Sequence, residues 1–467
     1  MSTTESQVDI GTPAATAGLD VESRPFSLGR IIRLSTFQIG SAMTDIFTAG
    51  VWNRIMISDF GIPAWPVGLL LALRYFMAPI SLWVGHRSDT RPMLGWYRTS
   101  YIWLGRGMIL VTFPIIGAST VWLEQDTGNP LAWLLLFLCF LAYGLGTLIS
   151  GSPYLALVRD SAPKSRQGIA IGIVETALIT MFPIAAVGFG RMLTTYDPAL
   201  FWRLILFVVV VGGFFWWFSV AGAEKINRSY GVGSGESARI DLRATFDLIW
   251  GDGRTRRFFL FLFVATFSAW LQDNILEPYG ADVFSWEVGQ TTRLTSYWGT
   301  ATVLVLVASF IIWRKRPPET LSGVTRTGLL IMALGMVILV GSAVGVASSA
   351  FLGGLVVFGA GFGLYTFGGL SLMAVMSPDP HSGAYLGLWT VAILVSKGLG
   401  TFIGGVIRDL MLAVQDEASL AYGVAFAFAA VGLVAAALLL SGFDIVGFAR
   451  DSGRDEIEHL PLASVEM

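Results

Sequence analysis

Gly85-His-Arg-Ser-Asp-Thr-Arg91 is a short polar stretch at the junction of two long apolar runs, residues 65–86 and 99–120. A glycine lets two helices approach closely, an aspartate can cap or pair at a helix end, and arginines can fix a loop against neighbouring helix ends. We therefore predict a turn between two membrane spans, with Gly85, Asp89, Arg91 and Arg98 as its signature residues. The turn is either a latch that opens during a conformational change or a fixed clamp.

Outward from this turn, apolar runs recur along the whole chain. Hydrophobic residues make up 54% of the sequence and charged residues 13%, whereas soluble proteins average roughly 25% charged residues. Spanning helices need about 20 mostly apolar residues, so the sequence predicts an all-α membrane protein with twelve transmembrane helices. Their expected positions are 34–57, 65–86, 99–120, 131–157, 168–192, 201–222, 257–280, 291–313, 326–347, 350–375, 383–408 and 419–441. The first and the seventh are the most polar.

The distribution of lysine and arginine predicts the orientation of these helices. Basic residues gather in four alternate connections, which hold Arg87, Arg159, Lys225 and Arg314, and they are few in the other connections. Because cytoplasmic loops carry the excess of Lys and Arg, we expect both termini in the cytoplasm. That requires an even number of spans, which twelve satisfies.

The chain is expected to have five parts. These are a flexible cytoplasmic tail (1–30), an N-terminal six-helix half (31–222), a cytoplasmic linker (223–256), a C-terminal six-helix half (257–442) and a cytoplasmic tail (443–467). The first part has no continuous apolar core, which argues against a cleavable signal. In the linker, Ile240, Phe246 and Ile249 or Trp250 suit a short amphipathic helix on the membrane surface; a plain linker with a helical stub is the alternative.

An internal repeat supports the division into two halves. Trp65-Pro-Val-Gly68 is followed 221 residues later by Trp286-Glu-Val-Gly289, and Asn53 matches Asn274 at the same offset. The pairs Gly144-x-Gly146 and Gly361-x-Gly363 are 217 residues apart. Repeats that share one membrane orientation are those expected of the major facilitator fold, whose halves are related by an axis along the membrane normal.

Several ionisable residues fall inside the predicted spans. They are Asp45, Arg54, Arg74, Arg106, Glu175, Asp273, Glu277 and Lys397. A lone charge at mid-membrane costs about 3 kcal/mol or more, so such residues usually face a cavity or a partner. We expect Asp45 to pair with Arg74 or Lys397, and Asp273 and Glu277 to share one helix face beside Asn274. Arg54 and Arg106 are expected to extend toward the membrane surface.

These charges allow two interpretations. Asp45, Glu175 or Asp273 can form a proton or ligand site in a central cavity, or the charges can be internal ion pairs that hold the two halves in one arrangement. The aromatic run Phe214–Phe218 also allows two: contact with lipid or a partner, or a flat platform for a pigment or isoprenoid.

The sequence excludes other kinds of site. A net charge of −2 gives no basic surface for nucleic acid, and the single cysteine, Cys139, cannot form an internal disulfide. The three histidines lack metal-ligand spacing. His86 and His381 lie at equivalent turns of the two halves, where ordinary loop residues are expected; either can also ligate the magnesium of a chlorophyll-type pigment. No phosphate loop, catalytic triad or aspartate-rich prenyl-diphosphate motif is present, so no enzymatic activity is expected.

One stretch is more specific than a general membrane-protein signature. Arg87-Ser-Asp-Thr is followed by Leu94-Gly-Trp96, by Arg98 and by Tyr101-Ile-Trp103. This pattern resembles the PucC family, the light-harvesting-complex assembly proteins of phototrophic bacteria. Asn53-Arg-Ile-Met-Ile57 also resembles that family. A looser match is Gly151-Ser-Pro-Tyr-Leu-Ala-Leu-Val-Arg-Asp160.

The resemblance implies a protein that assists the assembly of light-harvesting antenna polypeptides, works beside the pigment-synthesis machinery and handles bacteriochlorophyll. It also implies a location in the cytoplasmic or intracytoplasmic photosynthetic membrane. No catalytic residues are carried over from the family. Two alternatives remain open, a proton-coupled transporter of a small solute and an accessory subunit in bacteriochlorophyll synthesis.

Overall fold

The computed structural model describes residues 26–91, 93, 95–163, 166–224, 250–377, 382–415, 417–443, 445, 447 and 448, without the side chains of residues 82, 86, 89, 90 and 382–384. Helices account for nearly all of this chain. In the N-terminal half they are α1 (Leu28–Ser35), α2 (Phe37–Ile46), η1 (Phe47–Trp52), η2 (Ile55–Asp59), α3 (Ala64–Phe76), α4 (Pro79–Thr90), α5 (Thr99–Gln125), α6 (Pro130–Asp160), α7 (Gln167–Met192), α8 (Pro198–Phe207), η4 (Val208–Gly212) and α9 (Gly213–Val220). In the C-terminal half they are α11 (Gly253–Trp270), α12 (Leu276–Phe284), α13 (Val288–Thr292), α14 (Leu294–Trp313), η5 (Pro318–Leu321), α15 (Ser322–Gly345), α16 (Ser348–Val375), α17 (Ser382–Gln415) and α18 (Ala418–Ser441).

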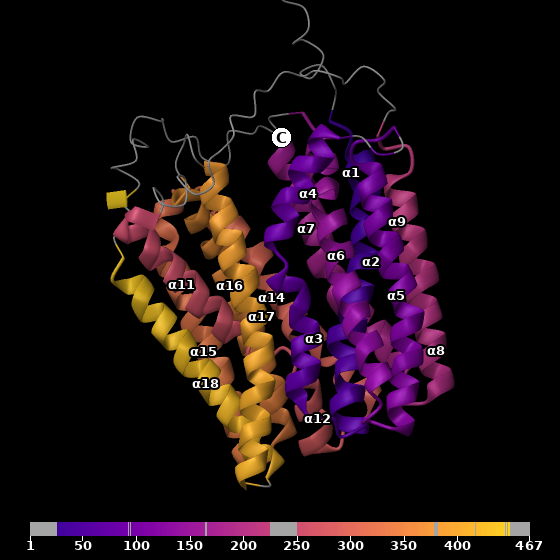
Figure 1. Ribbon diagram of the computed structural model, residues 1–467. Coiled ribbons are helices and arrows are strands. Elements are labelled where there is room, and N and C mark those ends of the chain that lie inside the picture. The colour runs from indigo at the N-terminus through magenta and orange to yellow at the C-terminus, as the bar shows by residue number, and fades with distance from the viewer. Residues whose placement is uncertain are drawn as a thin grey trace, which may run out of the picture.

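Long helices run side by side through the molecule, and the two ends of the described chain lie at the same end of the bundle (Figure 1). Within the described residues, ten helices are long and apolar enough to cross a membrane. The stretches 28–59 and 253–284 are not among them. The all-α membrane fold is therefore confirmed, while the count of twelve spans stays a prediction.

The two stretches outside this set correspond to the predicted first and seventh spans. Both are interrupted helices. The first contains the π-helical segments η1 and η2, and in the other residues 271–275 form turns between α11 and α12. π-Helical turns insert an extra residue and are frequent at functional sites. Polar residues and broken helices thus occur together in the same helix of each half.

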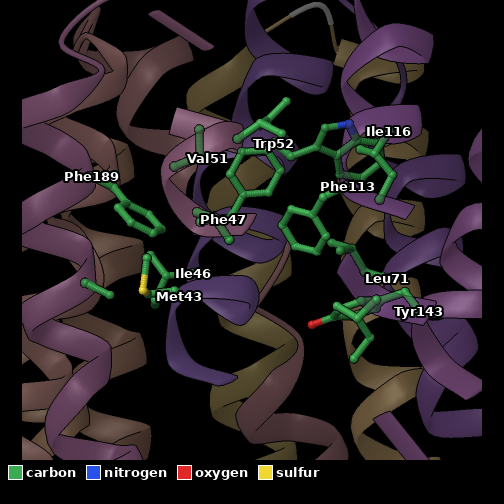
Figure 2. Close-up of a cluster of buried hydrophobic side chains, with 14 of the residues drawn as sticks. Met43, Ile46, Phe47, Val51, Trp52, Leu71, Phe113, Ile116, Tyr143 and Phe189 are labelled. Carbon is green, nitrogen blue, oxygen red and sulfur yellow. The ribbon is translucent and has the colours of Figure 1, made fainter. Parts of the chain in front are cut away.

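Each half has its own apolar core. Figure 2 shows part of the N-terminal core, in which Phe47 and Trp52 pack close to Phe113 and Ile116. The Trp52 indole donates a hydrogen bond of 2.9 Å to the Thr120 hydroxyl, so the polar edge of this buried ring is satisfied. A second core occupies the C-terminal half.

Glycines allow the closest helix contacts. A Cβ added to Gly335 on α15 would lie 2.6 Å from the backbone nitrogen of Phe358 on α16, and one added to Gly146 on α6 would lie 2.5 Å from the carbonyl oxygen of Gly105 on α5. Small residues permit such close approach of helix backbones in lipid. The Gly-x-Gly pattern found in the sequence therefore marks a helix crossing.

The two halves meet through the residues that the repeat pairs. The Asn53 side-chain amide donates a 2.8 Å hydrogen bond to the backbone carbonyl of Asn274, and the Asn274 amide donates one of 3.2 Å to the Ala64 carbonyl. Both asparagines are fully buried. Equivalent positions of two related halves can touch only near the axis that relates the halves, so this contact lies close to that axis.

Further polar contacts between the halves lie at the end of the bundle opposite the 85–98 turn. Arg54 donates a 3.0 Å hydrogen bond to the Trp286 carbonyl, and the Gly289 amide donates one of 2.8 Å to the Thr194 carbonyl. These connections close the bundle at that end.

We predict that Gly335→Val lowers the free energy of unfolding by about 1–3 kcal/mol, because its methyl groups would overlap the α16 backbone. Gly341→Val, on the same helix but with open space around the added carbon, is the matched control and should unfold like the wild type. Thermal unfolding of the purified protein in detergent measures both. Equal stability of the two variants would contradict the close α15–α16 contact.

Candidate functional site

Charged residues of the interior line a small cavity between the two halves. Its volume is about 90 Å³, and helices α2, α3, α12, α14 and α17 contribute to its wall. Five predicted site residues line it: Asp45, Arg74, Asp273, Glu277 and Lys397. The chain therefore brings together charges from both halves that lie more than 350 positions apart in the sequence.

Asp45 and Arg74 form the ion pair of this cavity, which confirms one of the two predicted pairings. The Tyr143 hydroxyl donates a 2.8 Å hydrogen bond to the same Asp45 oxygen. Arg74 also donates to the Tyr75 hydroxyl, at 2.5 Å. A buried ion pair is tolerated when further hydrogen bonds satisfy the charged groups, and the two tyrosines supply these bonds.

Lys397 is held differently, because its ammonium group lies over an aromatic ring. The nitrogen is 3.2 Å from the centre of the Trp270 ring and 5.0 Å from that of Tyr75. Among the described residues no carboxylate lies within 4 Å of this nitrogen, and Asp273 and Asp45 act on it at longer range. A desolvated cation over tryptophan gains about 2 kcal/mol, so the aromatic rings partly replace a counter-ion.

Asp273 and Glu277 stand on the other side of the cavity. The Thr401 hydroxyl donates a 3.1 Å hydrogen bond to Asp273, and the Thr295 hydroxyl donates one of 3.3 Å to Glu277. Both acids line the cavity, but the prediction that they share one helix face is wrong, because residues 271–275 form turns and only Glu277 lies on α12. Asn274, which was expected in the same network, instead occupies the seam between the halves.

The size of the cavity limits what it can hold. A water molecule takes up about 30 Å³ in the liquid, and sites for drug-sized ligands measure roughly 300–1,000 Å³. In this conformation the cavity of about 90 Å³ has room for a few waters. Any such water would lie beside Asp45, Arg74, Asp273, Glu277 and Lys397, which line the cavity.

Glu175 is not brought to this network. It lies half-buried on α7 and is absent from the described residues that line the cavity. The buried phenol of Tyr154 is within its electrostatic reach. The sequence analysis placed Glu175 with Asp45 and Asp273 as candidates for one central site. In the structure Glu175 lies apart from both.

Arg54 and Arg106 correct another expectation, because neither extends to the membrane surface. Their exposed fractions are 6% and 7%. Arg54 forms an ion pair with Asp59. The guanidinium carbon of Arg106 lies 4.5 Å from the ring centre of Phe37 and 4.6 Å from that of Trp216. Other protein groups enclose both charged side chains. The position of an arginine in the sequence does not show whether its side chain is enclosed in this way or extends to the membrane surface.

The aromatic run Phe214–Phe218 is divided between two environments. Trp216 is buried, at 1% exposure, whereas Phe214 and Trp217 are more than half exposed. The run therefore combines core packing with an outward-facing surface, and the exposed rings agree with the predicted contact with lipid or a partner.

The signature turn is tied to the ends of two other helices. Arg98 pairs with Asp160 at the end of α6, at 2.9 Å. Glu224, which follows α9, accepts 2.8 Å hydrogen bonds from the backbone amides of Tyr97 and Thr99. A carboxylate at a helix N-terminus accepts hydrogen bonds from the unpaired backbone amides. Its negative charge also interacts favourably with the positive end of the helix dipole. Gly95 supplies the left-handed backbone that the turn requires, with φ of +85°.

The other signature residues follow the same pattern. Gly85 faces α6, where an added Cβ would lie 3.6 Å from that of Ser152. The backbone carbonyl of Arg91 accepts a 3.0 Å hydrogen bond from the Tyr101 hydroxyl, while the Arg91 side chain is exposed. These contacts link the turn to helices of the N-terminal half and to Glu224, which directly follows it, an arrangement that suits a clamp.

Some predicted residues lie outside the described part of the chain. They include His381, the side chains of His86 and Asp89, and the linker residues Ile240, Phe246 and Ile249. Their proposed roles as pigment ligands, signature carboxylate and amphipathic helix stay predictions.

Sequence reasoning missed several polar partners. Tyr75 and Tyr143 complete the central ion pair, and Glu224 caps α5. Arg408 pairs with Asp282 at 2.8 Å. A tyrosine inside a long apolar run is the signal that could have revealed the first two, since its hydroxyl needs a partner when buried.

A second cavity faces outward rather than toward the charges. It is a groove of about 610 Å³ between α7 and α14, apolar apart from a few hydroxyl groups and Arg191. It offers much more room than the central cavity.

We predict a large coupling between Asp45 and Arg74. In a double-mutant cycle with Asp45→Asn and Arg74→Met, the coupling in the free energy of unfolding should be about 1–3 kcal/mol, because either single change leaves a buried charge unpaired. The cycle of Asp45→Asn with Lys397→Met is the comparison, and its coupling should be smaller. Thermal or denaturant unfolding in detergent provides the values; additive effects at Asp45 and Arg74 would refute the ion pair.

Solved structures with the same arrangement of helices are transporters. A D-xylose–proton symporter superposes with a TM-score of 0.66 at 15% identity, covering 89% of this chain and 98% of the symporter. The nucleoside transporter NupG also has a TM-score of 0.66, at 9% identity, covering 89% of this chain and 99% of NupG. These similarities establish the major facilitator fold.

Relatives by sequence come from phototrophic bacteria. Protein PucC of Cereibacter sphaeroides is 29% identical over 432 residues, covering 90% of this chain and 92% of that protein. The bacteriochlorophyll synthase 44.5 kDa chain of Rhodobacter capsulatus is 27% identical over 427 residues, covering 88% of this chain and 95% of that protein. The profile of the family described as PUCC protein matches residues 51–446. The chain belongs to the PUCC protein family, and its halves are folded as in the major facilitator transporters.

Proposed function

We propose that this protein is a non-enzymatic assembly factor for photosynthetic light-harvesting complexes. It would bind or deliver bacteriochlorophyll and assist the insertion of antenna polypeptides. The observation that carries the proposal is the family match over residues 51–446. The name of one relative, the bacteriochlorophyll synthase 44.5 kDa chain, links the family to that pigment.

The sizes and positions of the two cavities support this proposal. The central cavity of about 90 Å³ is too small for a macrocyclic pigment, and hydrogen bonds and aromatic rings already surround its charges. The outer wall, with its exposed aromatic rings on α9 and the groove between α7 and α14, offers apolar surface to molecules within the bilayer. In this view the interior charges hold the fold, and the exterior meets pigment and antenna helices.

The proposal includes a location and an orientation. The protein would lie in the cytoplasmic or intracytoplasmic photosynthetic membrane with both termini in the cytoplasm. Lysine and arginine are in excess in the connections on the same side of the membrane as the signature turn. This excess supports the proposed orientation.

An accessory role in bacteriochlorophyll synthesis is the neighbouring alternative, favoured by the name of the R. capsulatus relative. Our proposal assigns no catalysis to the chain itself. The described residues contain no group of three or more potential metal ligands. In this alternative the chain would hold pigment for another enzyme.

We predict that deleting the gene in its phototrophic host lowers the near-infrared absorbance of antenna complexes several-fold, because pigment and polypeptides would no longer be brought together. The intact protein, purified in mild detergent, should carry bacteriochlorophyll and small single-span polypeptides. Absorption spectra of membranes and mass spectrometry of the purified sample provide the two measurements. Normal antenna absorbance in the deletion strain would count against the proposal.

Proton-coupled transport is the second candidate, and the charge cluster favours it. Asp45, Arg74 and Lys397 meet at the interface of the two halves, where substrate and coupling-ion sites lie in this class of fold. A transporter would need the cavity to enlarge when the halves rock apart.

Lys397→Met separates the two functions. If the protein transports, proton-driven solute uptake into proteoliposomes should fall by more than about tenfold, since a positioned charge would be lost from the coupling site. If the protein assembles antennae, the variant should restore antenna absorbance in the deletion strain to within about twofold of the wild type. Loss of the antenna together with a normally folded, abundant variant would contradict a purely structural role for the cluster.

A further inference from the structure

The outward-facing groove between α7 and α14 has the dimensions of one membrane leaflet. Its α7 side extends from Thr180 to Arg191. Eleven helical steps of 1.5 Å cover about 16 Å, and half of a hydrocarbon core of about 30 Å is 15 Å. Because α7 ends at Met192, the groove spans the leaflet on the side opposite the signature turn.

The chemistry of the groove changes along its length. Apolar side chains such as Ile184 and Leu304 project outward along it, with exposed fractions of 55% and 65%. At its outer end stands Arg191, whose side chain is exposed and has no carboxylate within 4 Å among the described residues. The groove is thus an apolar trough with a positive charge at the level of the membrane surface.

A second arginine reinforces the charge at this end. Arg293 packs against Gly190, the residue before Arg191, and donates a 3.3 Å hydrogen bond to the Gly190 carbonyl. Its Nε atom is buried without a hydrogen-bond partner in the described chain. No acidic residue is among those that line the groove. The outer end therefore favours an anion.

The floor of the groove is open. A Cβ added at Gly188 would have no atom within 4 Å, so space remains above this glycine for a ligand chain. On the opposite face of the same seam, Phe182 and Thr295 line the central cavity, whereas their neighbours Pro183 and Ser296 line the groove. The two cavities therefore lie on opposite sides of the contact between α7 and α14.

We propose that the α7/α14 groove binds an anionic phospholipid, with an acyl chain in the trough and the phosphate at Arg191. Three observations carry this: a length that matches one leaflet, an apolar wall, and unpaired positive charge only at the headgroup end. The occupant contacts both halves, so its binding depends on the arrangement of the α7–α14 seam. This inference assigns to a lipid the groove that the proposed function offers to molecules of the bilayer, and it leaves the exposed rings on α9 for pigment and antenna helices.

Native mass spectrometry of the full-length protein tests the proposal. The protein is released from nanodiscs of phosphatidylcholine containing one-fifth phosphatidylglycerol, and retained lipids are identified. The wild type should keep one phosphatidylglycerol in preference to phosphatidylcholine. Arg191→Gln should reduce that preference about fivefold, in line with the attraction of one basic residue to anionic lipid. Gly188→Leu should reduce retention several-fold, because its side chain would occupy the open floor of the groove.

Gly172→Leu is the matched control for the second variant. Gly172 lies on the same helix and also has open space around an added carbon, but it is outside the groove, so its lipid retention should equal that of the wild type. Thermal unfolding confirms that each variant is folded. Unchanged retention in Gly188→Leu, an unchanged lipid preference in Arg191→Gln, or displacement of a pigment rather than a phospholipid by Gly188→Leu would each overturn the proposal.

Discussion

A charge cannot face hydrocarbon without a cost of several kcal/mol, and this constraint arranges the whole molecule. The two interrupted stretches, 28–59 and 253–284, carry Asp45, Arg54, Asp273 and Glu277. Neither is among the described helices that are long and apolar enough to cross a membrane, and the other helices shelter the charges that both stretches carry. Surrounded in this way, Asp45 meets Arg74 from α3, and Asp273 and Glu277 find hydroxyl groups on α17 and α14. The apolar helices form the wall around these contacts.

The fold could be predicted because each spanning helix is a long apolar run whose signal lies within about 20 consecutive residues. The family could be recognised for a similar reason, since its signature turn is continuous in sequence. The partners of the charges are another matter. Tyr143 reaches Asp45 across 98 positions, and Glu224 caps α5 from 125 positions away. The residues around Tyr143 or Glu224 in the sequence give no sign of these distant partners. The sequence therefore predicts which charged residues form the cluster better than it predicts the hydrogen bonds between them.

Arg106 shows why depth along a helix is a poor guide to environment. Its position within the α5 run suggested a side chain that reaches the membrane surface, yet two aromatic rings from α2 and α9 enclose its guanidinium group. The choice between surface and interior depends on which helices pack beside α5, and that is a property of the tertiary structure. The same dependence separates Trp216 from Trp217, adjacent residues of which one is core and the other faces outward.

The contact between Asn53 and Asn274 also shows where the symmetry of the two halves ends. On a two-fold axis, a residue of a symmetric dimer touches its own copy in the other subunit. In this chain the two related halves take the place of the two subunits, and an amide-to-carbonyl contact joins them near their axis. The present geometry is no longer symmetric, because Asn53 donates to Asn274 while Asn274 donates to Ala64. Because the two asparagines are separate positions of one chain, nothing requires them to have matching partners, and the same residue type serves two different contacts here.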